Sequence, residues 1–163
     1  VTVCGRYWKM FIVACIVTGC SANMTAAHPA AVRVLDAEVA VEQFPQSLSF
    51  VVTAVVRNSS RTVPIRRTCG TRVEKLSGNL WTTAYAEICV SAGGVGAEAI
   101  APGDSATERI RVSGYTSPLH LPRFDFGDSL AGEYRLWLTF LDVRMGDPSP
   151  RMFQAASNSF RLR

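Results

Sequence analysis

The sequence predicts an all-β domain, built as an antiparallel β-sandwich of about seven to eight strands. Three observations lead to this prediction. Apolar residues alternate with polar ones in several segments, turn-forming residues separate these segments, and no window of a dozen residues has the apolar stripe of an amphipathic helix. The 163 residues suffice for one domain with its own core, and the high aliphatic and aromatic content excludes a disordered chain.

The first twenty residues have the layout of a secretory signal. Arg6 and Lys9 supply positive charge, an apolar run follows from Met10 to Val17, and small residues come next. The apolar run has eight residues, whereas a membrane-spanning helix needs roughly 20. We therefore expect this segment to direct export.

The residues Val17-Thr18-Gly19-Cys20 resemble the lipobox of bacterial lipoproteins, in which an aliphatic residue and two small residues precede a cysteine. The resemblance implies cleavage between Gly19 and Cys20, a lipid on the Cys20 thiol and acylation of the new amino group. Two or three acyl chains attach a protein lastingly to a membrane. The alternatives are an ordinary signal peptide that happens to contain Gly-Cys, or a fragment of a buried helix.

These features predict three regions of the chain. Residues 1–19 form the signal peptide, residues 20–31 form the lipidated cysteine and a flexible tether, and residues 32–163 form the sandwich. No aspartate stands directly after Cys20, so the retention signal that some Gram-negative lipoproteins carry there is missing. This favours the outer membrane or the cell surface as the destination.

Within the sandwich, the first segment contains two apolar alternations that are out of step, which predicts a bulge or a crossing between sheets near Leu35-Asp36. Four later segments alternate regularly. Their inward side chains are predicted to be Leu48, Phe50, Val52, Ala54 and Val56; Ile110 and Val112; Tyr134, Leu136, Leu138 and Phe140; and Phe160 and Leu162.

Turn signals such as Ser77-Gly78-Asn79 and Pro102-Gly103-Asp104 separate the strands. Short strands at this spacing favour a sandwich of the immunoglobulin-like type. A small barrel is the structural alternative.

The cysteine count fits an exported protein. Cleavage before Cys20 removes Cys4 and Cys15, and lipidation uses Cys20, so that Cys69 and Cys89 remain. We predict a disulfide between these two, because export places them in an oxidising compartment. Two unpaired buried thiols are the alternative.

Neither a metal nor another cofactor is expected. Cys69 and Cys89 have no cysteine or histidine nearby in the sequence, and the histidines His28 and His120 fall in the tether and in a loop.

Short motifs in residues 45–163 resemble bacterial immunoglobulin-like domains of envelope lipoproteins and, more distantly, the sandwich of BsuPI-type proteinase inhibitors. The matching positions are Asn58, Trp81, Pro102-Gly103, Gly132 with Tyr134, and Ser157-Asn158 with Phe160. These positions are architectural, and we expect Tyr134 to pack as a corner residue. The more distant resemblance implies an inhibitor or modulator of an extracytoplasmic protease.

The overall charge argues against nucleic acid as a partner. The chain has 17 basic and 13 acidic residues, and a form that begins at Cys20 keeps 15 basic residues because Arg6 and Lys9 are lost. An excess of this size is too small for a nucleic-acid footprint.

Two features are candidate binding surfaces. One is a group of five arginines that could form an anion patch, because guanidinium groups bind phosphate and carboxylate. Alternatively, these arginines lie on solvated faces of hairpins or protect the edges of strands. Its members are Arg57, Arg61, Arg66, Arg67 and Arg72.

The other candidate consists of two long segments, around residues 113–129 and 144–157. Loops at the same end of the sandwich would favour binding, and loops at opposite ends would favour a covering role. The apolar and aromatic members of the first segment are Tyr115, Leu119, His120, Leu121 and Phe124.

The letters Gly127-Asp128-Ser129-Leu130 are similar to the nucleophile block of GDSL esterases, with Ser129 as nucleophile. That family also has a Gly-x-Asn-Asp motif and a histidine near the C-terminus. This chain has no Gly-x-Asn-Asp motif and no histidine after His120. Because a serine without a base is a weak nucleophile, a turn is the better interpretation and no catalytic residue is expected.

The sequence thus predicts a non-enzymatic lipoprotein of the bacterial envelope, anchored through its lipid, that binds or organises an envelope protein or polymer. A protease inhibitor is the alternative, and an esterase is a remote one.

Overall fold

The computed structural model describes residues 29–89, 98–143 and 150–163. In these ranges the chain forms nine strands and no helix, which confirms the all-β prediction and corrects the expected strand count. The first strand begins at Ala30, inside the range expected to be tether. None of the described residues belongs to a helix that would be long and apolar enough to cross a membrane.

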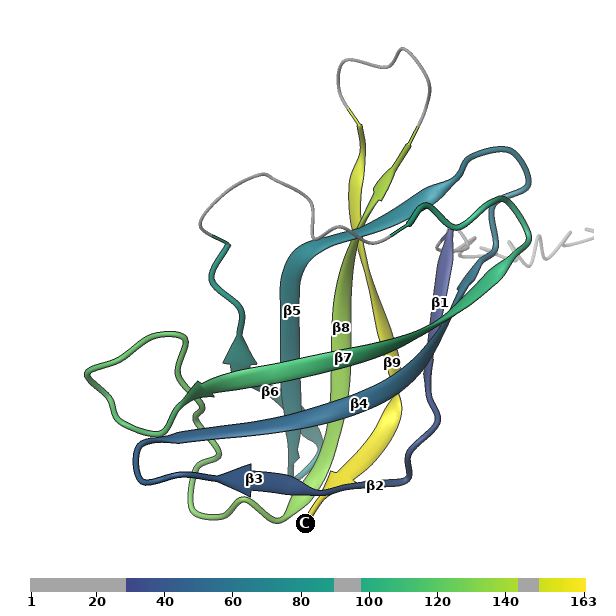
Figure 1. Ribbon diagram of the computed structural model, residues 1–163. Coiled ribbons are helices and arrows are strands. Elements are labelled where there is room, and N and C mark those ends of the chain that lie inside the picture. Colours follow the sequence, from purple (N-terminus) through teal and green to yellow (C-terminus); the bar gives the residue numbers. More distant parts are fainter. Residues whose placement is uncertain (1–28, 90–97, 144–149) are drawn as a thin grey trace, which may run out of the picture.

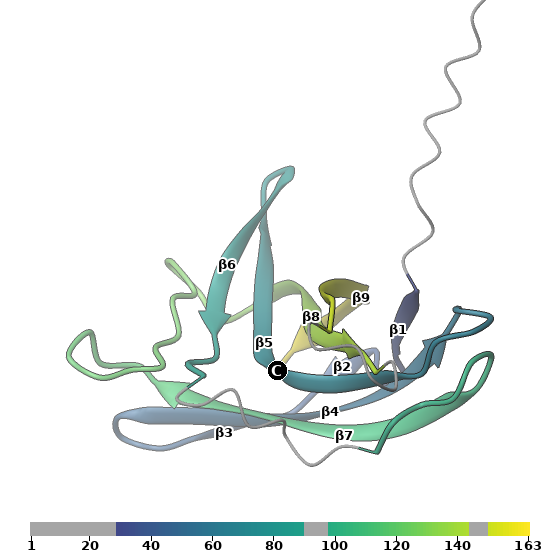
Figure 2. The ribbon, with the colours of Figure 1, turned by 90° about the horizontal axis from the view of Figure 1, so that it is seen from above.

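The strands form two sheets that pack face to face (Figures 1 and 2). The first sheet contains β1 (Ala30–Val34), β3 (Val41–Gln43), β4 (Ser47–Asn58) and β7 (Ser105–Tyr115). The second sheet contains, in spatial order, β2 (Glu38–Val39), β9 (Met152–Leu162), β8 (Gly132–Asp142), β5 (Ile65–Ser77) and β6 (Leu80–Ala86).

The connections follow the immunoglobulin-like plan. Strand β7 pairs with β4, and β8 pairs with β5, so in each pair two of the other described strands lie between the partners in the sequence. Both β1 and β3 pair with the opposite edge of β4, each along one half of it. The prediction of an immunoglobulin-like sandwich is therefore confirmed.

The irregularity predicted near Leu35-Asp36 is a crossing between the sheets. Strand β1 pairs with β4 in the first sheet, β2 then pairs in parallel with β9 in the second sheet, and β3 returns to the first. Asp36 stabilises the crossing, because its carboxylate accepts a hydrogen bond of 2.8 Å from the backbone of Thr53.

The inward residues predicted from the alternation all lie in the core between the sheets. Each of them is at most 3 % exposed except Leu162, at 4 %. The largest fully buried side chains are Tyr134, Phe50, Phe140 and Phe160. Burial of such side chains stabilises a sandwich by about 2 kcal/mol each.

Strand β5 bends at Gly70, where its pairing with β8 shifts register (Figure 1). Gly70 has a φ of 116°, and a Cβ atom there would lie 2.6 Å from Oγ1 of Thr139. Cys69 precedes the bend and forms a disulfide with Cys89, which follows β6. The predicted disulfide is therefore confirmed, and it fastens the exit of β6 to the bend.

Two asparagines hold segments together at the architectural positions. The buried side chain of Asn58 donates to the carbonyls of Val63 and Ile100, each at 2.9 Å. The side chain of Asn158 bonds both backbone groups of Val34 and thereby joins β9 to β1.

Candidate functional site

The connection between β7 and β8, residues 116–131, is fastened to the sandwich along its length. Near its start, the backbone of Tyr115 bonds that of Pro122 and of Phe124, each at 2.8 Å. Further along, the backbone nitrogen of Asp125 donates to Ala84 at the edge of β6. The loop is thus folded back against strands of both sheets.

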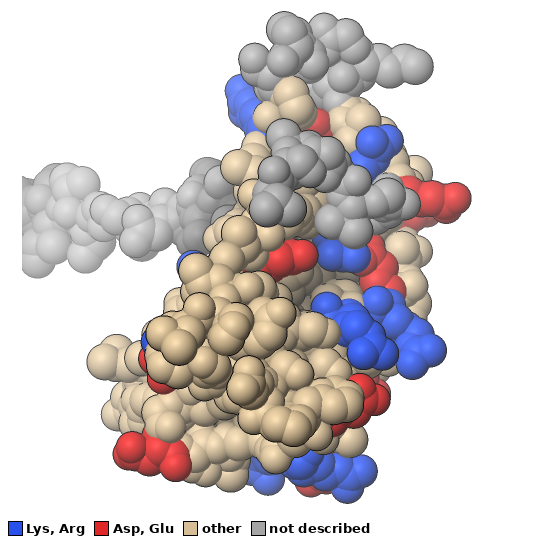
Figure 3. Space-filling model, turned by 60° about the vertical axis from the view of Figure 1, so that its left-hand side comes forward, with Lys and Arg blue, Asp and Glu red and all other residues tan. Residues whose placement is uncertain are grey.

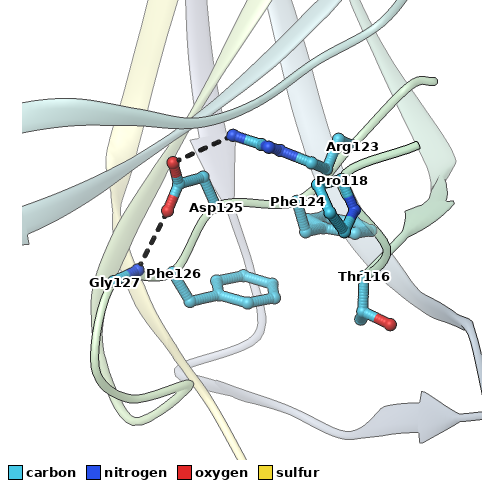
Figure 4. Close-up of a pocket in the computed structure, with 7 residues that line it drawn as sticks. All are labelled: Thr116, Pro118, Arg123, Phe124, Asp125, Phe126 and Gly127. Carbon is cyan, nitrogen blue, oxygen red and sulfur yellow. Dashed lines mark hydrogen bonds and ion pairs between the residues drawn. The ribbon is translucent and has the colours of Figure 1, made fainter. Parts of the chain in front are cut away.

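Lys75 fixes the second half of this loop. Its Nζ donates to the carbonyl of Phe126 at 2.8 Å and also to the carbonyl of Ser129. Asp125 adds local bonds, to the backbone of Gly127 at 3.2 Å and to Arg123 at 3.3 Å (Figure 4). The loop backbone is consequently well defined.

Phe124 belongs to the core and not to a binding surface. Its ring is 4 % exposed and stacks between Tyr85 and Phe126, at centroid distances of 4.7 and 5.0 Å. The hydroxyl of Tyr85 in turn donates to the carbonyl of Ser113. Of the residues predicted in this loop, Phe124 therefore has the covering role that the sequence left as an alternative.

The remaining predicted residues of the loop point to solvent. Leu119 is 86 % exposed and Leu121 is 70 % exposed, while Tyr115 is 38 % exposed with the ring of His120 against it at 5.0 Å.

Phe44, which is 58 % exposed, lies in the neighbouring turn between β3 and β4, and a bond from Thr116 to Gln46 joins this turn to the loop. We call Phe44, Tyr115, Leu119 and Leu121 the apolar loop surface. Figure 3 shows a broad area with few charges on the side of the molecule where this loop lies.

Two shallow hollows border the apolar loop surface. One has a volume of about 370 Å³ and lies between Pro118 and Phe126 (Figure 4). The other has a volume of about 220 Å³ and lies between Phe44 and Leu130. Both are open and shallow, so they suit side chains of a partner better than an enclosed small molecule.

A larger hollow of about 900 Å³ lies beside the disulfide, with Leu141, Met152 and Phe153 in its wall. It is at the other end of β8 from the loop. Of the second predicted segment, residues 144–149 lie outside the described residues. The prediction of a loop is wrong from Met152 on, because these residues pair with β8 as the strand β9. The first segment precedes β8 and the described part of the second follows it, so the two do not form one paired surface. This arrangement counts against joint binding by the two segments, and the exposed leucines of the first segment are the candidate surface that is left.

The arginines of the predicted anion patch are divided between the sheets. Arg57 lies on β4 and Arg61 in the following loop, whereas Arg66, Arg67 and Arg72 lie on β5. Arg67 forms an ion pair with Glu108 between the sheets, and Arg72 forms one with Glu74 at 3.2 Å. Two of the five are therefore neutralised locally.

Sequence reasoning missed a cluster on the outer face of the second sheet. Arg135 lies between Trp81 and Trp137, with its guanidinium carbon 4.5 and 5.2 Å from the two ring centroids. Arg72 covers Trp137 at 4.9 Å. The alternating order of cations and indole rings gives favourable cation–π contacts. The sequence singled out Trp81 and Arg72 for other reasons and placed Arg135 on an outward face, but it gave no signal that joined them.

The carboxylate of Glu74 completes this cluster. Its Oε2 accepts bonds of 2.7 Å from both Arg135 and the indole of Trp137. Burial alone would raise the pKa of Glu74, but these bonds and the charges of Arg135 and Arg72 outweigh burial and hold the pKa below its usual value. The cluster is satisfied internally, which is typical of a stabilising network.

Ser129 has the surroundings of a turn residue. Its hydroxyl accepts a bond of 3.0 Å from the backbone of Ala131. In the described part of the chain no hydrogen bond joins it to a histidine, and the ring of His120 packs at a tilt against Tyr115 instead. Over the same residues, no group of three histidine, cysteine or acidic side chains is placed to hold a metal.

The predicted lipidation site at Cys20 and the cleavage position at Gly19 lie outside the described residues.

Comparison with known proteins assigns no family to this chain. No family model matches it, and no curated protein matches it. It is similar to a target of the Northeast Structural Genomics Consortium, SoR45, with a TM-score of 0.46 and 16% identity, covering 83% of this chain and 86% of that one. It is also similar to the CooA pilin subunit from enterotoxigenic Escherichia coli, with a TM-score of 0.27 and 11% identity, covering 82% of this chain and 99% of that one. Neither similarity indicates a function here.

Proposed function

We propose that this chain is a lipid-anchored protein of the bacterial envelope that binds another envelope protein through the apolar loop surface. The observation that carries the proposal is the exposure of Leu119 and Leu121, at 86 and 70 %, on a loop with a fixed backbone. Exposed leucines do not contribute hydrophobic stabilisation to the free protein, but they would do so in a complex that buries them. A loop whose backbone is already fixed loses little conformational entropy when a partner binds it.

Two further features support the location. The lipobox residues Val17-Thr18-Gly19-Cys20 follow an apolar run directly, as anchoring through Cys20 requires. The disulfide between Cys69 and Cys89 is of a kind that persists in oxidising compartments and is rare in the cytosol.

A photo-crosslinking amino acid at position 119, in the full-length protein in cells, tests the binding surface. Leu80 provides the matched control, because it is a leucine with 72 % exposure at the tip of the β5–β6 hairpin. We expect a discrete cross-linked product from position 119 and none from position 80. The same products from both positions, or no product from position 119, would contradict the proposal.

The second candidate function is inhibition of an extracytoplasmic protease by the same loop. A projecting loop with a fixed backbone is also what an inhibitor presents to a protease cleft. Titration of envelope protease activity with the purified protein separates the two functions, because an inhibitor abolishes activity at a stoichiometric ratio and a general binding protein does not.

A further inference from the structure

The outer face of the first sheet carries four exposed arginines from three different strands. Their neighbours in each strand are core residues, so the arginine side chains point away from the core. We call this area the basic face, and its members are Arg33 on β1, Arg57 on β4, and Arg109 and Arg111 on β7.

The strand register places these arginines on one area of sheet. Arg109 and Arg111 on β7 lie opposite Thr53 and Val51 of β4, the strand that also carries Arg57. Arg33 on β1 pairs with the other edge of β4. From residue 57 to residue 51 the strand advances about 20 Å, and neighbouring strands lie about 4.8 Å apart. The four charges therefore spread over a surface that a flat anionic layer can contact at once.

Little within the described part of the chain neutralises this charge. Arg33, Arg57 and Arg109 have no ion pair there. Arg111 lies 3.7 Å from Glu42, but both side chains are more than 60 % exposed, and such pairs contribute little.

Two other carboxylates near the basic face are engaged elsewhere, and a third lies at its end. Asp36 bonds the backbone of Thr53 at the β1 edge, and Glu108 points inward to Arg67. Asp104 lies in the turn before β7, beyond the Arg57 end of the face. The surface between these groups has a positive excess.

The chain length before β1 determines what this face can reach. Nine residues separate Cys20 from Ala30, and nine extended residues span about 30 Å. Because β1 belongs to the same sheet, a body tethered at Cys20 keeps its basic face within reach of the lipid headgroups. Basic residues near a membrane are attracted by anionic headgroups and add to a lipid anchor.

We propose that the basic face docks on an anionic lipid surface and orients the sandwich beside its anchor. This inference rests on the proposed anchoring at Cys20, which supplies the proximity. The partner-binding role of the loop is independent of it.

The test uses the chain from Cys20 to Arg163, which contains every strand and the disulfide and therefore the whole sandwich. Cys20 is its one cysteine outside the disulfide, so a single alkyl chain can be attached there through a maleimide. One chain alone binds membranes weakly and reversibly, so a contribution from the protein surface is measurable. Supplying the anchor chemically also separates this test from natural lipidation.

The measurement is the partition coefficient onto phosphatidylglycerol vesicles and onto phosphatidylcholine vesicles, by sedimentation. One variant combines Arg33→Gln, Arg57→Gln and Arg109→Gln. The matched control removes the same charge from the second sheet and its β8–β9 connection, with Arg66→Gln, Arg151→Gln and Arg161→Gln. Circular dichroism melting shows that each variant is folded.

We expect the alkylated protein to prefer phosphatidylglycerol vesicles, and this preference to fall with added salt and by roughly fivefold for each basic-face arginine removed. The control should retain most of the preference. Equal losses in both variants, or no preference for phosphatidylglycerol, would overturn the proposal. Retention on a soluble polyanion column without any vesicle preference would overturn it too, and would assign the face to an anionic polymer.

Discussion

Tyr134 is the residue that closes the end of the sandwich below the apolar loop surface. Its ring is fully buried between Phe126 and Phe160, and its hydroxyl donates to the carbonyl of Leu130 four residues earlier. Burial raises the pKa of Tyr134 to about 12, so the hydroxyl stays protonated and continues to donate. This is the tyrosine corner of immunoglobulin-like sandwiches, as the sequence predicted.

Removal of this hydroxyl tests the contribution of the corner. We expect Tyr134→Phe to lower the free energy of unfolding by about 1 kcal/mol, because the Leu130 carbonyl loses its partner. Urea denaturation measures the change. The matched control Tyr115→Phe alters an exposed ring and should change stability by less than about 0.5 kcal/mol. Equal stability of Tyr134→Phe and the wild type would contradict this role.

Glu74 makes the stability of the protein depend on acidity. The folded-state pKa of Glu74 lies below the ordinary value of 4.5, so the ionised side chain contributes its full stabilisation at any pH above about 4.5. The contribution is lost as the pH falls through the folded-state pKa.

Glu74→Gln should lower stability by about 2 kcal/mol at neutral pH, because Arg135 and Arg72 lose their charged partner. When the pH is lowered from about 6 to about 3, urea denaturation should show a smaller decrease in the free energy of unfolding for Glu74→Gln than for the wild type. Parallel curves for the two proteins would show that Glu74 has no such role.

The position of an individual residue was predictable where it depends only on the alternation within one strand. Alternation within β8 identified Tyr134 as an inward residue, and the structure agrees. Phe124 was predicted as a binding residue but is buried. The prediction failed because nothing in the sequence of this loop shows that the loop folds back on β7. The Glu74 cluster joins residues 61 and 63 positions apart across bulged strands, and single-strand patterns do not reveal such a register.

At the scale of elements, β5 and β6 depend on the bend at Gly70 and on the disulfide beside it. Glu87 strengthens the same junction, because its carboxylate accepts bonds from the backbone of Gly70 and Thr71 at 3.1 and 2.9 Å. The bend turns the rest of β5 toward the Lys75 contact that fixes the loop.

Replacement of Cys69 and Cys89 by alanine should lower the free energy of unfolding by about 3 kcal/mol in the chain-entropy view. The comparison is made by urea denaturation of the oxidised protein and the double variant. In denatured but unreduced protein, thiol titration should find neither Cys69 nor Cys89 free. Two reactive thiols from these positions would contradict the disulfide.

Regular alternation identified β4, β7, β8 and the C-terminal part of β9, and the hairpin at Ser77-Gly78-Asn79 separates β5 from β6 as its turn residues predicted. Alternation did not identify β5, although it is the longest strand, and it missed the first half of β9, which was expected to be a loop. The extra strands arise because the segment expected as one irregular strand divides into β1, β2 and β3. That division depends on which sheet each piece pairs with, which is decided by tertiary packing.

At the scale of the whole molecule, the tether and the apolar loop surface lie at opposite ends of the first sheet. Ala30 pairs with Asn58 at one end of β4, and Tyr115 pairs with Ser47 at the other. The eleven steps between Ser47 and Asn58 span about 36 Å. A body anchored through Cys20 therefore presents the loop well away from its attachment point.

The positions of the two candidate surfaces depend on the complete fold. The sequence grouped five arginines because they are close in the chain, whereas strand alternation turns Arg67 inward and leaves Arg57 on the same outer face as Arg109 and Arg111, which belong to the paired strand β7. The exposed leucines were named correctly as loop residues. Their exposure, however, follows from how Lys75 and the strand edges hold the loop backbone.

The proposed location and the proposed docking both require a lipid on Cys20 in front of a folded, disulfide-bonded sandwich. The intact mass of the protein from the membrane fraction shows whether that lipid is present. We expect the mass of a chain that begins at Cys20, increased by the attached acyl groups and lower by the two hydrogens lost in the disulfide. A mass that retains residues 1–19, or an unmodified Cys20, would contradict both proposals.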